Sequence, residues 1–408
     1  MAVERVVIVG ASLAGVRAAE TLRQETFAGT ITMVGAETHR PYDRPPLSKK
    51  VLSGEWEPDR IQLRRPEALD ELGIEWVLGD AANGLDLDAR RVRLASGSSL
   101  DFDGLVIATG AEVRRLRDHP DWAGVHVIRT LDDSLRLRSE LVEGPRVVVI
   151  GAGFIGLEVA ATARQRGCQV IVLEGADAPM KRGLGSAMGR AAAMVHVDHG
   201  VDLRFGVAVE ALVESAPGRV GGVRLAGGET VPAEVVVVGI GVVPSTGWLE
   251  GSGVQLSDGV VCDATLNAGV PGVSAAGDVV RWYNERYGAH VRIEHWTTAS
   301  EQGAAAARNL LAVERGHPST PYSEVPFFWS DQFGSRIQFL GRADGDENLT
   351  VGLGSVEDRS FVALYERDGR LRAALGVSRP KTLMQVRRLL VSDAGWDEAL
   401  EFARGLSV

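Results

Sequence analysis

A glycine-rich segment near the middle of the chain has the spacing of a site that binds a dinucleotide. Its pattern G-x-G-x-x-G directly follows the apolar run Val147–Ile150, and Glu174 stands eighteen residues after the last glycine. Glycines at these positions allow a tight turn and let the backbone approach a pyrophosphate at the N-terminus of a helix. An acidic residue about twenty positions further on accepts hydrogen bonds from the ribose hydroxyls. The expected contacts are Gly151, Gly153, Phe154, Ile155 and Gly156.

The carboxylate of Glu174 also bears on which nucleotide is bound. Like charges about 4 Å apart cost on the order of 1 kcal/mol even when they are screened, so Glu174 disfavours the extra phosphate of NADPH. Lys181 and Arg182 are near enough in the sequence to weaken this preference. The segment therefore favours NADH.

A second glycine segment, less complete than the first, stands near the N-terminus. Val6–Gly15 (VVIVGASLAG) matches Val147–Gly156 (VVVIGAGFIG), which begins 141 residues later. Ser12 replaces the middle glycine, and it is small enough to admit a pyrophosphate if its φ angle is negative. Glu37 ends the next apolar run, as a ribose ligand would. A plain strand-to-helix turn also favours glycine, but the repeat indicates two nucleotides.

Short apolar runs alternate with helical segments as far as Gly239, which is typical of parallel strands covered by helices on both faces. The expected strands are Arg5–Val9, Gly29–Gly35, Gly104–Thr109, Arg146–Ile150, Gln169–Glu174 and Glu234–Gly239. After Val325 aromatic and alternating segments predict an antiparallel sheet with one solvated face, followed by helices from Arg379. The sequence thus predicts an α/β fold with two Rossmann-like domains and a C-terminal α+β domain.

Composition excludes several classes of function. The chain has 408 residues, 45% apolar and 24% charged, with a net charge of −10 and no basic stripe, so we expect no nucleic-acid partner. No signal peptide precedes the first strand and no apolar run could span a bilayer, so we expect a cytoplasmic protein without membrane contact. Cys168 and Cys262 are far apart and form no redox pair or metal site, so we expect buried thiols and no bound metal.

Two further turns complete an ordered set of motifs. Ala108-Thr109-Gly110 follows one predicted strand, and Ala276-Gly277-Asp278 follows the run Val270–Ala275. Each alone is a plain turn, but in this order they resemble the two-dinucleotide-binding flavoprotein family. The chain is more closely similar to FAD-dependent ferredoxin reductases of the putidaredoxin reductase and rhodocoxin reductase type. The segments that carry this resemblance are Pro41–Lys49 (PYDRPPLSK), Arg129–Asp133 (RTLDD), Phe154–Ala161 (FIGLEVAA), Ile293–Trp296 (IEHW) and Phe328–Gln332 (FWSDQ).

The resemblance implies a glutathione-reductase-like architecture. It places FAD on residues 1–113 and 239–322 and NADH on residues 114–238, and it makes residues 323–408 a C-terminal domain. Asp278 is expected beside the ribityl chain, and a plain role as a helix N-cap is compatible with that. The implied cofactor contacts in the FAD and C-terminal parts are Gly10, Ser12, Ala14, Gly15, Ala36, Glu37, Arg44, Lys49, Ala82, Thr109, Gly110, Arg129, Gly277, Asp278, Trp296 and Trp329.

By the same resemblance, Lys49 and Glu158 are the catalytic pair at the N5 edge of the flavin. Opposite charges in a partly dry cleft would order the nicotinamide pocket. The alternative for Glu158 is an ordinary exposed helix residue. Trp296 and Trp329 would shield the flavin, and their alternative is the hydrophobic core.

The implied activity is transfer of hydride from NADH to FAD, followed by single-electron transfer to a small [2Fe–2S] or similar ferredoxin that serves a monooxygenase or dioxygenase. Arg40–Lys49 contains no cysteine, which argues against the thiol mechanism of disulfide-reducing relatives. Two alternatives stay open. One is an oxidoreductase that reduces a quinone or another small-molecule acceptor. The other is a flavin-bound redox-sensing scaffold similar to apoptosis-inducing factor.

A ferredoxin with an acidic surface would need local positive charge on its reductase. In the predicted helix Arg379–Val391, Lys381, Gln385 and Arg388 share one face. Leu383, Val386 and Leu390 occupy the opposite face for packing on the domain. We hypothesise that Arg387 and Arg388 assist docking, and an ordinary solvated helix face is the alternative.

Overall fold

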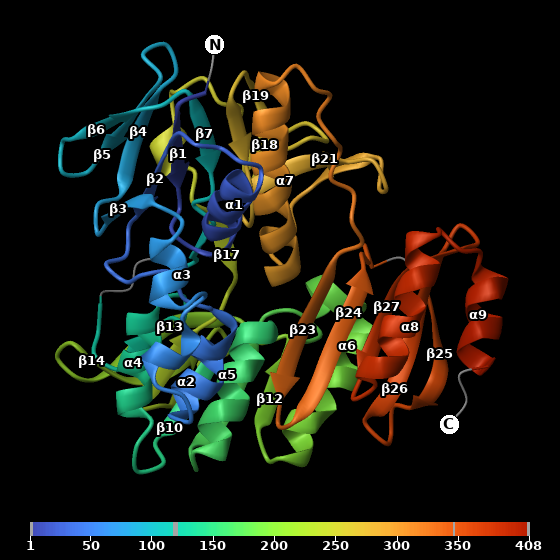
Figure 1. The fold of residues 1–408 in the computed structure, drawn as a ribbon. Coiled ribbons are helices and arrows are strands. Elements are labelled where there is room, and N and C mark those ends of the chain that lie inside the picture. Colours follow the sequence, from blue (N-terminus) through green and yellow to red (C-terminus); the bar gives the residue numbers. More distant parts are fainter. Residues whose placement is uncertain (1–2, 117–120, 346, 406–408) are drawn as a thin grey trace. The chain divides into compact units, whose positions relative to one another are not determined.

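The computed structural model describes residues 3–116, 121–345 and 347–405, and its contacts divide the chain into two compact units (Figure 1). The first unit comprises Met1–Asp43, Ile61–Glu112 and Val242–Glu324. The second comprises Arg44–Arg60, Val113–Gly241 and Val325–Val408. The three-domain division expected from the sequence stays a prediction, since the contacts group the NADH part, the C-terminal part and residues 44–60 together.

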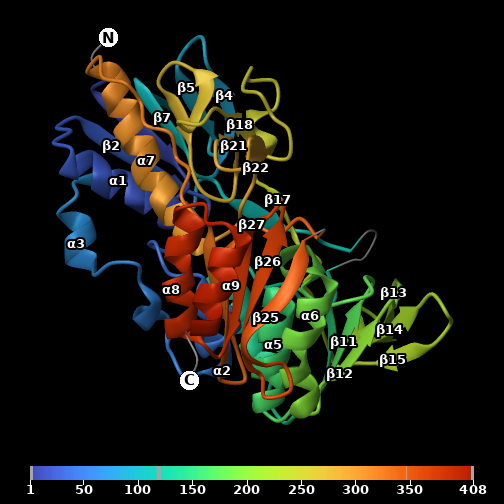
Figure 2. The same ribbon diagram turned by 90° about the vertical axis from the view of Figure 1, so that its right-hand side faces the viewer.

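The first unit is built on a six-stranded sheet in the order β19-β20-β7-β1-β2-β3. All neighbours are parallel except β19, which is antiparallel to β20. Its strands are β1 (Arg5–Val9), β2 (Thr30–Gly35), β3 (Ile74–Leu78), β7 (Gly104–Ile107), β19 (Asn267–Val270) and β20 (Val273–Ala275). Helices α1 (Leu13–Gln24) and α7 (Trp296–Glu314) run side by side (Figure 2).

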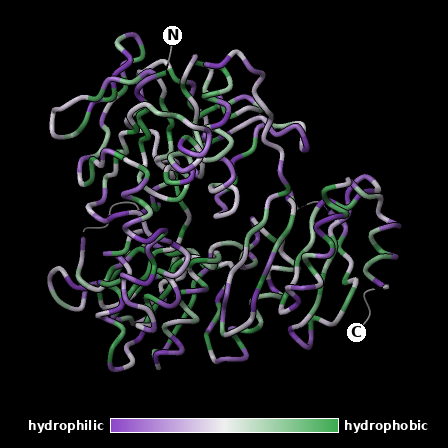
Figure 3. The backbone as a smooth tube through the Cα atoms, in the orientation of Figure 1, coloured by the Kyte–Doolittle hydropathy of each residue, from purple (hydrophilic) through white to green (hydrophobic). Residues whose placement is uncertain are grey.

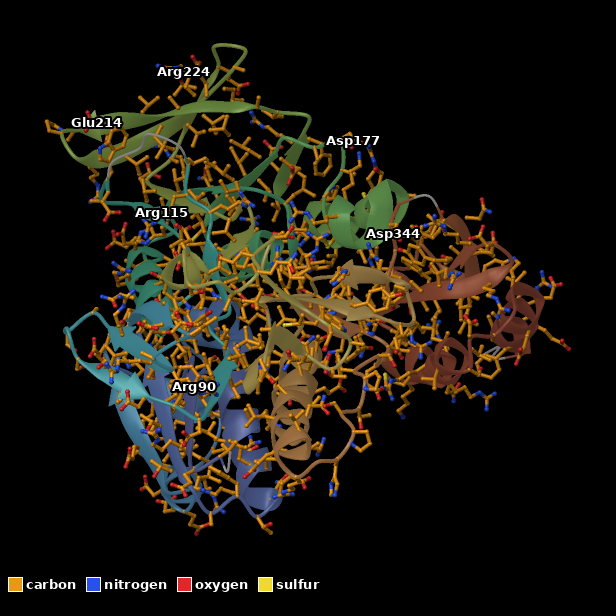
Figure 4. The ribbon with its side chains drawn as sticks, turned by 90° about the horizontal axis from the view of Figure 1, so that it is seen from above. Arg90, Arg115, Asp177, Glu214, Arg224 and Asp344 are labelled. Atoms are coloured by element: carbon orange, nitrogen blue, oxygen red, sulfur yellow. The ribbon has the colours of Figure 1, made fainter. Side chains whose placement is uncertain are left out.

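The first unit also contains several smaller elements. An antiparallel hairpin sheet comprises β4 (Ala82–Asp86), β5 (Arg91–Leu94) and β6 (Ser99–Asp101). Arg90, labelled in Figure 4, donates hydrogen bonds to the carbonyls of Phe102 and Pro271 and so ties the hairpin to the unit. The remaining strands and helix of the unit are β18 (Val260–Cys262), β21 (Val280–Asn284), β22 (Ala289–Val291) and α3 (Pro66–Asp70). The chain leaves the unit within β8 (Ala111–Val113) and re-enters it at β17 (Val242–Pro244).

The second unit contains a five-stranded parallel sheet in the order β12-β11-β10-β16-β9. The strands are β9 (Val125–His126), β10 (Arg146–Ile150), β11 (Gln169–Glu174), β12 (Asp202–Phe205) and β16 (Val235–Val238). The helices of this unit before its C-terminal part are α2 (Lys50–Ser53), α4 (Leu131–Glu140), α5 (Phe154–Gln165) and α6 (Lys181–Asp198). A small antiparallel sheet, on which Figure 4 labels Glu214 and Arg224, comprises β13 (Val209–Ala216), β14 (Arg219–Leu225) and β15 (Thr230–Pro232).

The six predicted strands are confirmed, three with the predicted bounds and three with ends that differ by one or two residues. They form because runs of β-branched residues can be buried on both faces of a sheet covered by helices. The apolar stretches of the chain are coloured green in Figure 3. Among the described residues, no helix has the length and apolar character that a membrane span requires.

The C-terminal part is an antiparallel sheet in the order β23-β24-β27-β26-β25, as predicted. Its elements are β23 (Phe327–Gln332), β24 (Ser335–Gly341), β25 (Asn348–Ser355), β26 (Ser360–Arg367), β27 (Arg370–Val377), α8 (Pro380–Val391) and α9 (Trp396–Gly405). The expectation that one face is solvated is wrong. Leu340 and Leu364 pack with α8 and α9, whereas Phe339 and Ala363 belong to the core that includes α5.

Candidate nucleotide-binding and redox site

In the first unit the glycine turn brings the end of β1 against the end of β7. A Cβ atom on Gly10, whose φ angle is 126°, would lie 2.0 Å from the Ala108 carbonyl oxygen. A Cβ on Gly15 would lie 2.0 Å from the Gly10 carbonyl oxygen. Ser12 is the N-cap of α1 with a φ of −131°, and its side chain makes no capping hydrogen bond. The turn therefore meets the condition set for Ser12, and the helix N-terminus can receive a phosphate group.

Other predicted contacts of this unit gather around the same turn. A Cβ on Gly277 would lie 3.2 Å from the Ala14 Cβ, which places the Ala276–Asp278 turn against the start of α1. The Gly277 amide donates to Gln302 Oε1 at 2.9 Å. Asp278 lies in the turn before β21, and α7 has His295 as its N-cap, so the N-cap role expected for Asp278 is wrong.

The remaining residues of the first unit lie at strand ends. Ala36 and Glu37 follow β2, and Glu37 accepts a hydrogen bond from the Tyr42 hydroxyl. Ala82 begins β4. Thr109 and Gly110 follow β7, and Thr109 Oγ1 donates to the Ser245 carbonyl at 2.8 Å. The residues after β2 and β7 are thus at the carboxyl ends of parallel strands, where open α/β sheets bind ligands, whereas Ala82 starts a strand of the antiparallel sheet.

The two tryptophans do not belong to the core. Trp296 begins α7, is 38% exposed, and donates from Nε1 to Asp43 Oδ1 at 2.7 Å. Trp329 on β23 is half-buried, with its ring stacked on Phe327 at a centroid distance of 6.0 Å. The alternative that they are core residues is therefore wrong.

The second unit repeats the glycine turn. A Cβ on Gly151, whose φ is 104°, would lie 2.3 Å from the Gly239 carbonyl oxygen, and one on Gly156 would lie 2.2 Å from the Gly151 carbonyl oxygen. Gly153 is the N-cap of α5, with open space around the position of a Cβ. The helix has no acidic residue in its first turn, so its N-terminus suits the pyrophosphate of a dinucleotide.

Glu174 is held at the end of β11 by the backbone. One carboxylate oxygen accepts from the Ala152 amide at 2.7 Å and the other from the Ala176 amide at 2.8 Å. Lys181 forms an ion pair with Asp177, which Figure 4 labels, at 2.7 Å. Because Lys181 is already paired, it opposes the effect of Glu174 less than its position in the sequence suggested.

Lys49 and Glu158 are in direct contact. Lys49 Nζ lies 2.9 Å from Glu158 Oε2, and Glu158 is only 2% exposed, so its expected alternative as an exposed helix residue is wrong. Ser48 Oγ donates to Oε2 at 2.5 Å, and Ser330 Oγ donates to Oε1 at 2.6 Å. A buried carboxylate is stable only when it is paired and hydrogen-bonded, and these three donors meet that need.

The part of the motif that belongs to the second unit, Arg44–Lys49, is positioned by helices of that unit. Its prolines start a short 3₁₀ turn, Pro45–Ser48. Ser134 Oγ on α4 donates to the Leu47 carbonyl at 2.6 Å, and Thr162 Oγ1 on α5 donates to the Ser48 carbonyl at 2.8 Å. These bonds fix the backbone from which Lys49 reaches Glu158.

Arg44, Arg129 and the first turn of α4 form a second anchor of the same segment. The Arg44 guanidinium donates to the Arg129 carbonyl. Thr130 and Asp133 form a reciprocal capping box at the start of α4. The motif Arg129–Asp133 thus has a helix-starting role that its sequence, T-x-x-D, signals.

Sequence reasoning did not single out Ser48 or Ser330 as site residues. Each was inside a recognised motif, directly beside Lys49 or Trp329. Since neighbouring residues of a strand point to opposite faces, the residue next to a suspected ligand is a candidate for the facing side. Applied to Phe328–Gln332, that rule would have marked Ser330.

Both cysteines are free and buried, as expected. Burial raises the pKa of the Cys168 thiol, and it raises the pKa of the Cys262 thiol strongly. Cys168 precedes β11 and Cys262 ends β18, away from the two glycine turns in sequence. Neither has the lowered pKa of a redox-active thiol.

Two strand–turn–helix sites for dinucleotides and a buried lysine–glutamate pair, without an activated thiol, define an oxidoreductase that works through bound cofactors. Comparison with known proteins agrees. Residues 4–303 match the family described as pyridine nucleotide-disulphide oxidoreductase, and residues 327–401 match the reductase C-terminal family. The chain therefore belongs to the pyridine nucleotide-disulphide oxidoreductase family.

The chain is 37% identical to rhodocoxin reductase of Rhodococcus erythropolis, covering 95% of this chain and 90% of that protein. It is 37% identical to the ferredoxin–NAD(+) reductase component of the anthranilate 1,2-dioxygenase system of Burkholderia cepacia, covering 97% and 96%. It also matches the crystal structure of a covalent putidaredoxin reductase–putidaredoxin complex, with a TM-score of 0.89, 32% identity, and coverage of 96% and 93%. The predicted fold class and resemblance are confirmed, and the chain is an oxidoreductase whose cofactors are FAD and NADH.

Proposed function

We propose that the chain is an NADH-dependent ferredoxin reductase that delivers single electrons to a small [2Fe–2S] or similar ferredoxin serving an oxygenase. When bound, FAD would supply the chemistry that accepts a hydride and releases its two electrons one at a time, with the proton passing to solvent. The observation that carries the proposal is the buried Lys49–Glu158 pair at the start of α5. It stands in a chain whose relatives include ferredoxin–NAD(+) reductases of oxygenase systems.

The protein contributes binding and orientation. The Gly10–Gly15 turn would hold the FAD pyrophosphate, with Glu37 at a ribose and Asp278 near the ribityl chain. The Gly151–Gly156 turn would hold the NADH pyrophosphate, with Glu174 at a ribose. The free helix N-termini at both turns support this assignment.

We assign Lys49 and Glu158 to the nicotinamide pocket. The Lys49 side chain is 18% exposed and the Glu158 side chain 3%, so the lysine is the more accessible member of the pair. Burial strengthens the attraction between Lys49 and Glu158 and holds both side chains in place. A charged pair held in this way can orient a substrate.

We place the ferredoxin-docking surface on α8. Its exposed face carries Lys381, Gln385 and Arg388, and the opposite residues Leu383, Val386 and Leu390 are buried, as predicted. Arg388 lies over the Phe402 ring at 4.4 Å, which holds its charge at the surface. Charge reversal at Arg387 and Arg388 should weaken ferredoxin reduction at low salt, and unchanged rates would refute this surface.

We propose the cytoplasm as the compartment. NADH is a cytoplasmic reductant, and the free thiols of Cys168 and Cys262 suit a reducing environment.

The test of the proposed function is a comparison of electron acceptors at equal NADH concentration. The FAD-loaded protein is assayed with a [2Fe–2S] ferredoxin, a quinone and oxygen alone. Faster reduction of the ferredoxin than of either other acceptor is expected. Rapid peroxide formation or quinone reduction that exceeds ferredoxin reduction would favour the small-molecule reductase. A long-lived charge-transfer complex with poor turnover on every acceptor would favour the redox-sensing scaffold.

A further inference from the structure

A series of hydrogen-bonded polar side chains runs from Glu158 into the core of the second unit. Ser330 Oγ donates to Glu158 Oε1 at 2.6 Å, and Gln332 Nε2 donates to Ser330 Oγ at 3.0 Å. Gln332 Oε1 lies 2.8 Å from His196 Nε2. All four residues are at most 2% exposed. Buried polar groups are costly unless each is satisfied, so the series is a specific arrangement rather than a surface contact.

Three elements supply this series: β23, α5 and α6. Ser330 and Gln332 are two residues apart on β23 and therefore point to the same face. Two residues before Ser330 on the same face, the half-buried Phe328 meets Phe154 at a centroid distance of 4.6 Å in an edge-on contact. Phe154 and Glu158 are one turn apart on α5 and share a face of the helix. Phe328 on the strand therefore meets Phe154, and Ser330 meets Glu158.

Every donor in the series points toward Glu158. The Gln332 side-chain oxygen can only accept, so His196 Nε2 carries the proton and donates to it. Burial lowers the pKa of His196 to about 4, so the ring is neutral near pH 7. Ser330 then accepts from Gln332 and has its own hydroxyl proton left for Glu158. The side-chain amide of Gln332 accepts from His196 and donates to Ser330, so it fixes the direction of the hydrogen bonds in the series.

The series also leaves one polar atom unsatisfied. Among the described residues, His196 Nδ1 has no hydrogen-bond partner. Its ring contacts Phe333 edge-on at a centroid distance of 5.1 Å. An apolar residue would avoid this cost, which on packing grounds alone makes His196 a poor choice. Unlike an apolar residue, His196 forms a hydrogen bond to Gln332.

Resting on the catalytic role proposed above for Lys49 and Glu158, we infer that Ser330, Gln332 and His196 are positioning residues for Glu158. Ser330 holds Oε1, so that Oε2 stays turned toward Lys49 and Ser48. Gln332 and His196 hold the Ser330 hydroxyl in the donating orientation. The C-terminal strand β23 therefore completes a site whose other parts come from α5 and the Pro41–Lys49 motif.

The experiment uses anaerobic single-turnover reduction of the FAD-loaded protein by NADH. Ser330→Ala should lower the limiting rate of flavin reduction on the order of tenfold, since a hydrogen bond to a charged group is lost. The apparent NADH dissociation constant should change less than the rate. Ser335→Ala is the matched control, because Ser335 is on the same hairpin and its hydroxyl contacts Ser378 at 2.9 Å. It should leave the rate unchanged.

A double-mutant cycle separates positioning from a merely structural role. In the Glu158→Gln background the Ser330→Ala substitution should cost less than twofold, because its effect passes through the carboxylate. Equal losses in both backgrounds would overturn the inference. Gln332→Leu, expected to slow reduction less than Ser330→Ala, supplies a second variant if Ser330→Ala unfolds. An unchanged rate in folded Gln332→Leu would then overturn it.

Failure of the inference is distinguishable from failure of the proposed function. If Glu158→Gln slows flavin reduction and Ser330→Ala does not, only the positioning role falls. If Glu158→Gln itself leaves the rate unchanged, the catalytic pair falls, and the positioning role falls with it.

Discussion

The two glycine turns, one in each unit, differ at one position and agree at the other two. The first and last glycines are in near contact with a carbonyl oxygen in both units, where a Cβ would approach within 2.0–2.3 Å. At the middle position one unit has Ser12 and the other has Gly153 in open space. The outer glycines are therefore required by the fold itself, whereas the residue at the middle position is constrained by the bound ligand. A missing middle glycine does not weaken the assignment of a dinucleotide fold.

The largest expected effect is from substitution of an outer glycine. Gly10→Val and Gly151→Val place a side chain on a residue with positive φ, against a carbonyl oxygen. Each should destabilise its unit by roughly 3 kcal/mol or more. Thermal unfolding of the two variants measures this. A variant with wild-type stability would break the equivalence of the two turns.

Lys49→Met should have the next largest effect. It leaves the Glu158 carboxylate buried without its cation, which typically costs about 3 kcal/mol. Denaturant unfolding followed by a probe in the second unit should detect the loss, and NADH should reduce the flavin more slowly. Lys50→Met is the control, because the Lys50–Glu55 pair is exposed on both sides. Equal stability losses for the two lysines would contradict the assigned burial.

One histidine in each unit, the half-buried His295 and the buried His196, predicts a common dependence on pH. Burial lowers the pKa of His295 in the first unit and of His196 in the second from 6.5 to about 4. Below pH 6.5 the unfolded chain binds protons that the folded chain does not, so stability falls as the pH falls from 6.5 toward 4. Between pH 6.5 and 5 the buried His196 should contribute a loss of about 2 kcal/mol, and the half-buried His295 should contribute less. Chemical denaturation of His196→Gln should show a smaller loss, and an identical loss would contradict a neutral buried His196.

Glu174 should decide the choice of nucleotide by a smaller margin. Glu174→Gln removes the charge that opposes the phosphate of NADPH, so the preference for NADH should fall about tenfold. The ratio of kcat/KM for the two nucleotides is the readout. Asp202→Asn is the control, because it loses an exposed ion pair to Arg204 and leaves both Glu174 and Lys181 unchanged. A ratio that is unchanged in Glu174→Gln would remove this residue from the specificity site.

The smallest effect on stability is expected at the middle of the second turn. Gly153 has a φ of −74° and no atom near a Cβ, so Gly153→Ala should change the free energy of unfolding by less than about 1 kcal/mol. NADH affinity should fall only modestly, because the methyl group narrows the approach of the pyrophosphate without closing it, as the side chain of Ser12 would in the first turn. Calorimetric titration with NADH measures the second effect. A large loss of stability would erase the distinction between outer and middle glycines.

The fold was largely predictable because its strands are continuous apolar runs beside glycine turns, as at Val6–Gly15 and Val147–Gly156. The solvation of the C-terminal sheet was not, since alternation in a strand does not reveal that helices α8 and α9 cover one face. In the candidate site, the glycine segments and the Lys49–Glu158 pair were anticipated. The contact of Ser330 with Glu158 joins residues 172 apart, and no local pattern encodes it.

The proposed electron path can be followed directly by anaerobic double-mixing absorbance, in which the FAD-loaded protein meets NADH and then a [2Fe–2S] ferredoxin. We predict that the flavin absorbance bleaches on the first mixing and returns on the second as the ferredoxin is reduced in single-electron steps. The first phase should be slowed in Glu158→Gln. A flavin that NADH reduces but that only a quinone or oxygen reoxidises would contradict the assignment of a ferredoxin partner.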